Sequence, residues 1–501
     1  MNKEKEKVLN EFKDHVRKMS LLGGTIALLD WDSRVYMPEK GVANRGESLG
    51  YLAGEFHKLN VSPKVKEFVD AFSKENDLDN VTSAMLRGTK KQYEISLKIP
   101  AAWEEEYSIL CTNSSSAWRK AKSTGDFEVF RPHLEKIVDM KFQYLKLLGC
   151  NEKGYDVLLD DFESGITVEK LDELFGELRD GIVDLLNKIK NSKTQINDSI
   201  LNVTVPKETQ IKLCNFILEK MGFDFEAGRM DETEHPFTTS FSNKDVRITN
   251  HYYENDFTNA LFSAIHEGGH AIYEQDIPDS LENTGVNSAA SLGVHESQSR
   301  FYENIIGRSY EFWEYFYPEI QKEIPEFKNV SLEEFYKTIN KVQPSLIRTS
   351  SDELTYSLHI IIRYEIEKAL IEGKIQVKDL PIVWNTKYKE YLGIEPKNNS
   401  EGVLQDTHWA DGTIGYFPSY ALGNLYGAQF LNTMLKDIPN VYEELSKGNL
   451  DSIHKWLREN VHEYGAIYTP SELIKKVTGE ELTAKYFLQY LNKKYSNIYN
   501  L

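Results

Sequence analysis

One five-residue stretch, His266-Glu267-Gly268-Gly269-His270, constrains this chain more than any other. It follows the H-E-x-x-H pattern, in which the second histidine comes four positions after the first. On an α-helix this spacing places both imidazoles on one face, with Cβ atoms about 5–6 Å apart. Such a pair can bind one Zn²⁺ ion, and the intervening Glu267 can act as general base toward a water molecule held there. The pattern therefore predicts a helix that carries a metal site.

The flanking residues favour this helix. Asp256 or Thr258 can cap its first turn, and Leu261, Ile265 and Ile272 recur at helical spacing. The two adjacent glycines each cost a helix about 1 kcal/mol relative to alanine. A purely structural helix has little reason to contain them, so we expect another segment to approach closely at this point.

A catalytic zinc site usually has three protein ligands, which leaves one position for water. Asp276 has the spacing of a third ligand in a longer motif, but that motif needs a glycine where Tyr273 stands. Glu274 lies one turn beyond His270 and is better suited to an outer position. Glu296 lies in a second predicted helix that begins near Ser291. We favour Glu296 as the third ligand. Glu254 and Asp256 are candidates to orient the histidines from outside.

The rest of the chain is predicted to be mainly α. Proline is sparse, at 15 of 501 residues, and helix-start signals recur at Thr167, Pro206, Ser331 and Thr469. The segments 112–116 and 397–402 have loop-like compositions. We expect one large helical domain over residues 1–501, with two lobes on either side of a groove as a variant of the same fold.

One region departs from the helical pattern. Residues 237–241 and 245–249 alternate apolar and polar side chains on either side of a polar turn, which predicts a β-hairpin. Val246 and Ile248 should face one way, and Asp245, Arg247 and Thr249 the other. A strand beside a metal site can hold a peptide by main-chain pairing. A hairpin that only closes the helical domain is the alternative.

Charge and cysteine content limit the partners. The formal net charge is −19, which argues against nucleic acid or an anionic membrane surface. The charged N-terminus does not resemble a signal peptide, and no run of residues is apolar enough to span a membrane. Cys111, Cys150 and Cys214 are scattered. These features predict a cytoplasmic protein.

Further motifs give the chain a family resemblance. The H-E-x-x-H stretch followed by His295-Glu296-Ser297 resembles the M32 metallocarboxypeptidases, the carboxypeptidase Taq family. Ser351 replaces an alanine of the family pattern I-R-x-x-A-D. The other matching stretches lie in family order between about residues 20 and 430, and they are Trp31-Asp32, His235-Pro236-Phe237, Asp245–Thr249, Ile347–Asp352, Gly402–Trp409 and Gly415–Tyr420.

The resemblance implies an almost all-helical fold, with a deep groove, a metal at its base and a small antiparallel β-sheet nearby. It implies a homodimer that removes single residues from the free C-termini of peptides, with broad side-chain tolerance. The metal implied is Zn²⁺, and Co²⁺ is often accepted in its place.

The residue types, together with the family resemblance, suggest the roles. Glu267 would move the proton, and His408 or Tyr416 would donate to the developing oxyanion. An exopeptidase must also hold the substrate's free carboxylate, for which the arginine fork is well suited. The resemblance to the I-R-x-x-A-D pattern makes Arg348, with Tyr420 as its partner, the first candidate for this role, and Arg247 is the second. His235 is expected to shape the cleft.

Other functions share parts of this pattern. A dipeptidyl-carboxypeptidase or an oligoendopeptidase would have the same metal site and differ in what closes the groove. An inactive, metal-stabilised binding protein is the non-enzymatic alternative, although a purely structural zinc site has no use for Glu267. No acidic anchor for a free amine precedes the metal helix, which disfavours an aminopeptidase.

Overall fold

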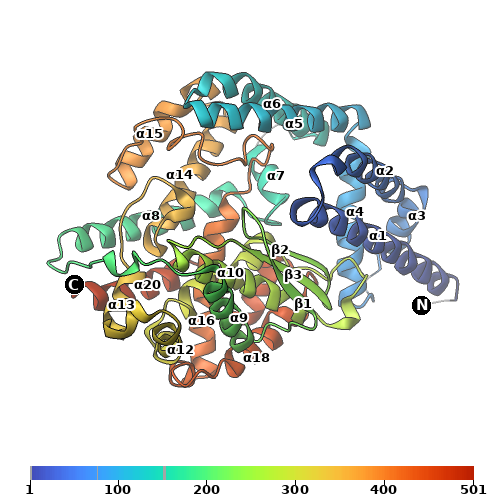
Figure 1. The fold of residues 1–501 in the computed structure, drawn as a ribbon. Helices are drawn as coiled ribbons and strands as arrows, with labels where there is room; N and C mark the ends of the chain where they lie inside the picture. The colour runs from blue at the N-terminus through green and yellow to red at the C-terminus, as the bar shows by residue number, and fades with distance from the viewer. Residues whose placement is uncertain (1–2, 76, 151–153) are drawn as a thin grey trace.

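Helix α10 (Phe257–Asp276) runs through the middle of the molecule and carries both histidines of the H-E-x-x-H pattern (Figure 1). The computed structural model describes residues 3–75, 77–150 and 154–501. Asp256 caps α10 by accepting the N–H of Asn259, and Leu261 and Ile265 are almost fully buried. The predicted amphipathic helix is therefore confirmed. Met1 and Asn2, which begin the charged N-terminal stretch, lie outside the described residues.

Helices make up most of the described chain, as predicted. Ahead of the sheet they are α1 (Lys3–Val35), α2 (Val42–Asn60), α3 (Pro63–Phe72), α4 (Asn80–Lys98), α5 (Ala101–Thr124), α6 (Phe127–Leu148), α7 (Gly154–Asp160), α8 (Val168–Lys190) and α9 (Lys207–Met221). After α10 they are α11 (Leu292–Arg300), the π-helix η4 (Phe301–Ile306), α12 (Tyr310–Glu323), α13 (Leu332–Ile339), α14 (Glu353–Ile371), α15 (Leu380–Tyr391), α16 (Pro418–Asp437), α17 (Val441–Leu445), α18 (Asp451–Asn460), α19 (Pro470–Thr478) and α20 (Lys485–Tyr499).

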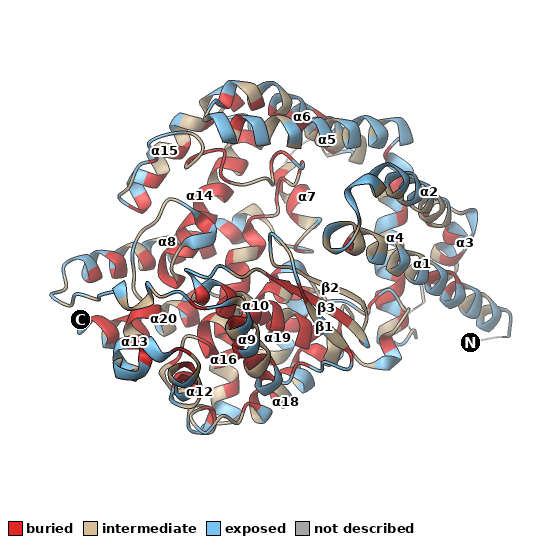
Figure 2. Cartoon of the chain, viewed as in Figure 1, coloured by how far each residue is buried: buried red, intermediate tan, exposed pale blue. Residues whose placement is uncertain are grey.

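The buried residues gather around α10, α14 and α16, whereas α1 and α2 are largely exposed or only partly buried (Figure 2). One large hydrophobic cluster extends from Ala121 to Tyr499. A smaller cluster joins α1, α3 and α4 to the segment after α10, with Phe12 and Phe68 at its centre. Burial therefore stabilises the region around α10 most strongly, and this is the region that carries the H-E-x-x-H pattern.

A three-stranded sheet, formed by β1 (Gly228–Glu232), β2 (Thr238–Ser242) and β3 (Asp245–Asn250), lies against α10. The predicted hairpin is present as the antiparallel pair β2–β3, and Val246 and Ile248 are fully buried as expected. The sheet as a whole is mixed rather than antiparallel, because β1 pairs with the other edge of β3 in parallel. The chain reverses once between β1 and β2 and again before β3, so the first and third strands run the same way.

The prediction of a loop at residues 112–116 is wrong, because these residues are part of α5. Thr112 donates its hydroxyl hydrogen back to the carbonyl of Ser108, and Ser114 is fully buried. Short polar side chains can form their hydrogen bonds with carbonyl groups of their own helix in this way. The packing of α5 against α6 then outweighs their weak helix propensity. The other predicted loop, 397–402, is confirmed as turns and bends. Among the described helices, none is both long and apolar enough to cross a membrane.

Candidate active site

Three side chains proposed as metal ligands converge on one point. His266 and His270 lie one turn apart on α10, with ring centroids 5.0 Å apart. Glu296, on α11, directs Oε2 toward them, 3.6 Å from His266 Nε2 and 3.3 Å from His270 Nε2. One potential ligand atom from each of the three residues lies within 4.8 Å of the others. The structure therefore brings together α10 and α11, which are separated in the sequence by the segment between Asp276 and Leu292.

The two other candidates for the third ligand lie elsewhere. Glu274 accepts a hydrogen bond from the ring of His295 at 2.9 Å, so it occupies an outer position. Asp276 is held at the far end of α10 by His454 and His462, at 2.8 and 2.7 Å. The helix continues through Tyr273, as expected in the absence of a glycine there, and it carries Asp276 away from the histidines.

Glycines allow α11 to approach α10 closely. A Cβ added to Gly269 would lie 2.6 Å from the carbonyl oxygen of Gln298. On the other side of α11, a Cβ at Gly423 of α16 would lie 2.6 Å from Cγ of Glu296. The expectation that a segment approaches the glycines of α10 is therefore confirmed. The missing side chains let Glu296 reach the histidines.

Substitution of Gly269 by alanine should weaken the site. The new Cβ would meet the backbone of α11, which cannot rotate away as a side chain could, so α11 and Glu296 must shift. We expect metal affinity to fall by on the order of tenfold or more, as for other losses of ligand orientation, measured by calorimetric Zn²⁺ titration.

Gly176→Ala in α8 is the matched control, since its added Cβ would meet no described atom within 4 Å apart from its chain neighbours and the nearby backbone of its own helix. That variant should gain about 1 kcal/mol of helix stability and bind metal normally. Unchanged metal affinity in Gly269→Ala would contradict the close-approach argument.

Two charged residues that the sequence analysis did not identify hold the ligands in place. Glu303, on η4, accepts a hydrogen bond from His266 Nδ1 at 2.8 Å. With Nδ1 protonated, the Nε2 lone pair of His266 points to the site. Arg300 donates from Nε to Glu296 Oε1 at 2.7 Å and lies 3.3 Å from Glu303. Ser299 Oγ lies 3.0 Å from the other carboxylate oxygen of Glu296, Oε2, and 2.7 Å from the backbone carbonyl oxygen of Glu296.

Glu254 and Asp256, proposed earlier to orient the histidines, are both exposed, and Asp256 serves as the cap of α10. Glu303 orients His266 instead. A sequence signal for it exists, because Glu296, Arg300 and Glu303 follow one another at helical spacings of four and three. That pattern indicates one charged face on the second helix.

The electrostatics of the three side chains suit a divalent cation. Burial, reinforced by His295, lowers the pKa of His270 to about 3, so its imidazole is neutral. Burial alone would raise the pKa of Glu303, but Arg300 and His266 lower it to about 2. Burial also disfavours a charge on His266, yet Glu296 and Glu303 outweigh it and raise its pKa. Burial would likewise raise the pKa of Glu296, but Arg300 and His266 hold it well below its usual range, so the third side chain is a carboxylate. Two imidazoles and one carboxylate are a common ligand set of catalytic zinc.

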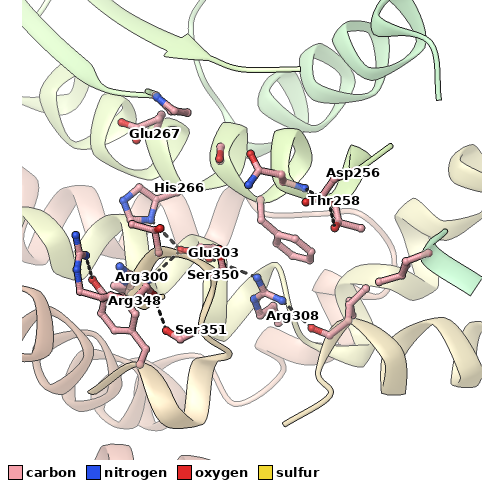
Figure 3. Close-up of a pocket in the computed structure, with 18 of the residues that line it drawn as sticks. Asp256, Thr258, His266, Glu267, Arg300, Glu303, Arg308, Arg348, Ser350 and Ser351 are labelled. Atoms are coloured by element: carbon pink, nitrogen blue, oxygen red, sulfur yellow. Dashed lines mark hydrogen bonds and ion pairs between the residues drawn. The ribbon is translucent and has the colours of Figure 1, made fainter. Parts of the chain in front are cut away.

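Glu267 lies beside the ligands and borders a cavity of about 410 Å³ (Figure 3). Its side chain is 6% exposed. Arg300, Arg348 and Tyr356 line the same cavity. The proposed general base and the first candidate for carboxylate binding thus face one space, which is the arrangement that a carboxypeptidase cleft requires.

Arg348 belongs to a buried cluster that carries more positive than negative charge. Its Nε donates to Asp406 Oδ1 at 3.0 Å, and one terminal nitrogen donates to the hydroxyl of Tyr356 at 3.2 Å. Arg363 pairs with the other oxygen of Asp406, at 2.6 Å. Burial would raise the pKa of Asp406, but Arg363 and Arg348 hold it well below its usual range. Two guanidinium groups therefore share one carboxylate, which leaves this cluster with one net positive charge.

His408, Tyr416 and Tyr420 lie together near Arg348. The ring of Tyr420 is 4.9 Å from the guanidinium carbon of Arg348, and its hydroxyl is 3.1 Å from His408 Nε2. The rings of His408 and Tyr416 are 5.4 Å apart. Burial lowers the pKa of His408 to about 4, so its imidazole is neutral near pH 7. Four residues predicted for substrate binding thus form one group.

The last two predicted substrate residues are placed differently. His235 is exposed in the segment before β2. Arg247 is paired with Asp245 at 2.8 Å, and its guanidinium carbon lies 4.5 Å from the ring of Trp31 and 5.0 Å from that of Phe241. Arg247 thus joins α1 to the sheet, so the geometry favours Arg348 as the carboxylate anchor.

Comparisons with known proteins agree with this site. The family model described as carboxypeptidase Taq (M32) metallopeptidase matches residues 11–495. The chain is 45% identical over 493 residues to carboxypeptidase 1 of Bacillus subtilis, covering 98% of each chain. It is 38% identical over 484 residues to thermostable carboxypeptidase 1 of Pyrococcus furiosus, covering 96% of each.

A solved structure gives the same result for the fold. The crystal structure of an M32 carboxypeptidase from Deinococcus radiodurans R1 superposes with a TM-score of 0.95 at 35% sequence identity. The match covers 99% of this chain and 100% of that one. The likeness therefore extends over the whole fold and includes the helices that carry His266, His270 and Glu296.

Proposed function

Because the chain belongs to the M32 family of metallocarboxypeptidases, we propose that it releases single amino acids from the C-termini of peptides and uses a zinc ion to do so. Family membership makes it a peptide hydrolase. The observation that carries the finer proposal is that one cavity joins Glu267 and His266 to Arg348, which belongs to a cluster of two arginines and one carboxylate with a net positive charge.

His266, His270 and Glu296 are the proposed ligands, and their two imidazoles and one carboxylate favour zinc, with Co²⁺ as a possible substitute. When bound, zinc would supply a Lewis acid that polarises the scissile carbonyl and lowers the pKa of water. The remaining work falls to the chain's own side chains. Glu267 accepts the proton of the attacking water and returns it to the leaving amine.

His408 and Tyr416 are the candidates to donate a hydrogen bond to the oxyanion. Arg348 is proposed to receive the α-carboxylate of the substrate, because that group would supply the charge missing from the Arg348–Asp406–Arg363 cluster. Tyr420 would then support the guanidinium from its ring face. The edge strand β2 is proposed to pair with the main chain of the peptide.

We further propose a cytoplasmic homodimer that acts on peptides with broad side-chain tolerance. Cys111 and Cys214 are not joined by a disulfide, which suits a reducing compartment. The net charge of −19 disfavours nucleic acid and anionic membranes as partners.

Replacement of Arg348 by alanine tests the exopeptidase assignment. For a peptide with a free C-terminus, kcat/KM should fall by about 10²- to 10³-fold, since truncating one partner of a buried charged contact costs about 2–5 kcal/mol and each ~1.4 kcal/mol is a factor of ten. The C-terminally amidated twin of that peptide should be cleaved slowly by both enzymes, with little difference between them.

Arg247→Ala is the comparison variant, because Arg247 was the other candidate anchor. A selective loss of free-ended cleavage in Arg247→Ala, with normal kinetics in Arg348→Ala, would transfer the role to Arg247. Equal rates on the free and amidated peptides in the unaltered enzyme would instead favour an oligoendopeptidase. Release of dipeptides in place of single residues, followed by mass spectrometry, would indicate a dipeptidyl-carboxypeptidase.

A further inference from the structure

Strand β2 presents one hydroxyl group to the helix that carries Glu267. Oγ1 of Thr238 lies 2.5 Å from Glu267 Oε2 and 3.2 Å from the backbone oxygen of Glu267. The hydroxyl has one hydrogen, and the shorter distance together with the charge of the carboxylate favours donation to Oε2. The contact joins two elements that are 29 residues apart in the sequence.

The register of the sheet explains why Thr238 faces α10. Thr238 lies opposite Ile248, and directly opposed residues share one face of a sheet. Ile248 is fully buried, and β3 packs against α10. Thr239 lies opposite Arg247 and so points to the other face, toward α1. Alternation along β2 therefore selects Thr238 for the contact with Glu267 and excludes its neighbour.

In the part of the chain that the structure describes, no second hydrogen bond of this kind holds the Glu267 carboxylate. Among the described residues, Thr238 supplies the hydrogen bond recorded to its carboxylate, and Oε1 accepts none. The terminal torsion of a glutamate side chain has a broad preference, so the carboxylate plane is free to turn unless something holds it. A general base must lie within hydrogen-bonding reach of the proton that it accepts. One fixed oxygen leaves the other to face the cavity that Glu267 lines.

The backbone N–H and C=O groups of Thr238 do not pair with β3. β2 is an edge strand in the order β1-β3-β2. The N–H of Thr249 donates to the carbonyl of Phe237, so Phe237 and Thr249 form a hydrogen-bonded pair. In an antiparallel ladder such pairs alternate, and the backbone groups of Thr238 therefore point to the open edge. A change confined to the Thr238 side chain leaves this edge intact.

We propose that Thr238 is a positioning residue for catalysis, whose hydroxyl orients the Glu267 carboxylate toward the attacking water. The inference rests on the proposed function, in which Glu267 is the general base. It assigns to β2 a role in the chemical step in addition to any pairing with substrate. A catalytic base held in one orientation avoids the loss of rate that follows from small misplacement.

Two substitutions at Thr238 test the proposal in the metal-loaded enzyme. Thr238→Val has nearly the same shape and favours strands, but it lacks the hydroxyl. Its kcat should fall about 10- to 100-fold, the usual effect of removing an outer hydrogen-bond partner, while KM changes by less than about twofold because the strand edge is intact. Thr238→Ser retains the hydroxyl and should keep kcat within about threefold of normal.

Thr239→Val is the matched control, because it removes the same group from the opposite face of the strand. The backbone groups of Thr239 face Arg247 of β3 and not the open edge, so the variant should leave kcat unchanged. All variants should retain one metal ion by elemental analysis and melt at nearly the normal temperature. A normal kcat in Thr238→Val would overturn the proposal. An equal loss in Thr238→Ser and Thr238→Val would overturn it too, since the effect would then belong to packing of the methyl group.

A double-variant comparison shows whether Thr238 acts through Glu267. In the background of Glu267→Gln, whose residual rate is followed with a fluorogenic peptide, adding Thr238→Val should change kcat by less than about twofold. Multiplication of the two single losses would mean that Thr238 acts independently and would overturn the proposal. Near-normal kcat in Glu267→Gln alone would defeat the proposed function itself. A large loss in Glu267→Gln with normal Thr238→Val would defeat only the role of Thr238.

Discussion

Replacement of Glu267 by glutamine is expected to lower kcat by about 10²- to 10⁴-fold, the range typical of general acid–base catalysis. Glutamine keeps the length and most of the hydrogen bonding of the side chain but cannot accept the proton. Its neutral amide also fits the buried position, because Glu267 is only 6% exposed. The fold and the metal triad should therefore persist, and the loss should appear in kcat with little change in KM.

Glu274→Gln is the matched control for this experiment. Glu274 lies on the same helix and is similarly buried, at 9% exposed, but it contacts His295 and not a ligand or the cavity. Replacement of Glu274 should lower kcat much less than replacement of Glu267 does. Elemental analysis of both variants should give one metal ion per chain. A kcat for Glu267→Gln close to that of the unaltered enzyme would remove Glu267 from the mechanism.

Removal of the metal is the second large expected effect. Dialysis against a chelator should reduce peptidase activity to the background rate, and stoichiometric Zn²⁺ should restore it. The folded protein should also lose stability, since a metal at a thousand times its dissociation constant adds about 4 kcal/mol to unfolding. The loss of stability has a cause in the site. Carboxylate oxygens of Glu296 and Glu303 lie 3.6 Å from Nε2 and 2.8 Å from Nδ1 of His266, and the bound cation would offset part of their negative charge.

The readouts for metal removal should agree with one another. Activity and the free energy of unfolding should both return with the same metal stoichiometry, as measured by titration of the metal-free protein. Co²⁺ should restore activity as well. Full activity in a preparation shown by elemental analysis to contain no transition metal would refute the proposed mechanism.

Local patterns predicted the elements that carry the site. The H-E-x-x-H spacing predicted the helix of His266 and His270, and a second helix carrying Glu296 was predicted to begin near Ser291, where the structure shows the Ser291 side chain as its cap. Both depend on contacts within a few residues, namely side chains one turn apart and a hydroxyl that accepts a nearby backbone N–H. Alternation of apolar residues predicted the β2–β3 hairpin for the same reason.

Patterns that depend on distant partners were harder to interpret. The segment 112–116 has the composition of a loop, yet the packing of α5 on α6 makes it helical. Strand β1 has little apolar alternation, and its pairing with β3 comes from the way the chain returns to the sheet. The role of Glu303 was not predicted, because the sequence indicates a charged helix face but not which histidine that face contacts.

The sequence by itself determined the two histidines, the base between them and the second helix with its carboxylate, because all of these follow from short spacings along one chain. Only the tertiary structure decided what surrounds them. It placed α11 against the glycines of α10, gave Arg348 and Arg363 a single shared carboxylate in Asp406, and turned Arg247 toward Trp31. These outcomes depend on which helix faces meet when the core packs, and contacts between residues tens to hundreds of positions apart leave no periodic trace in the sequence.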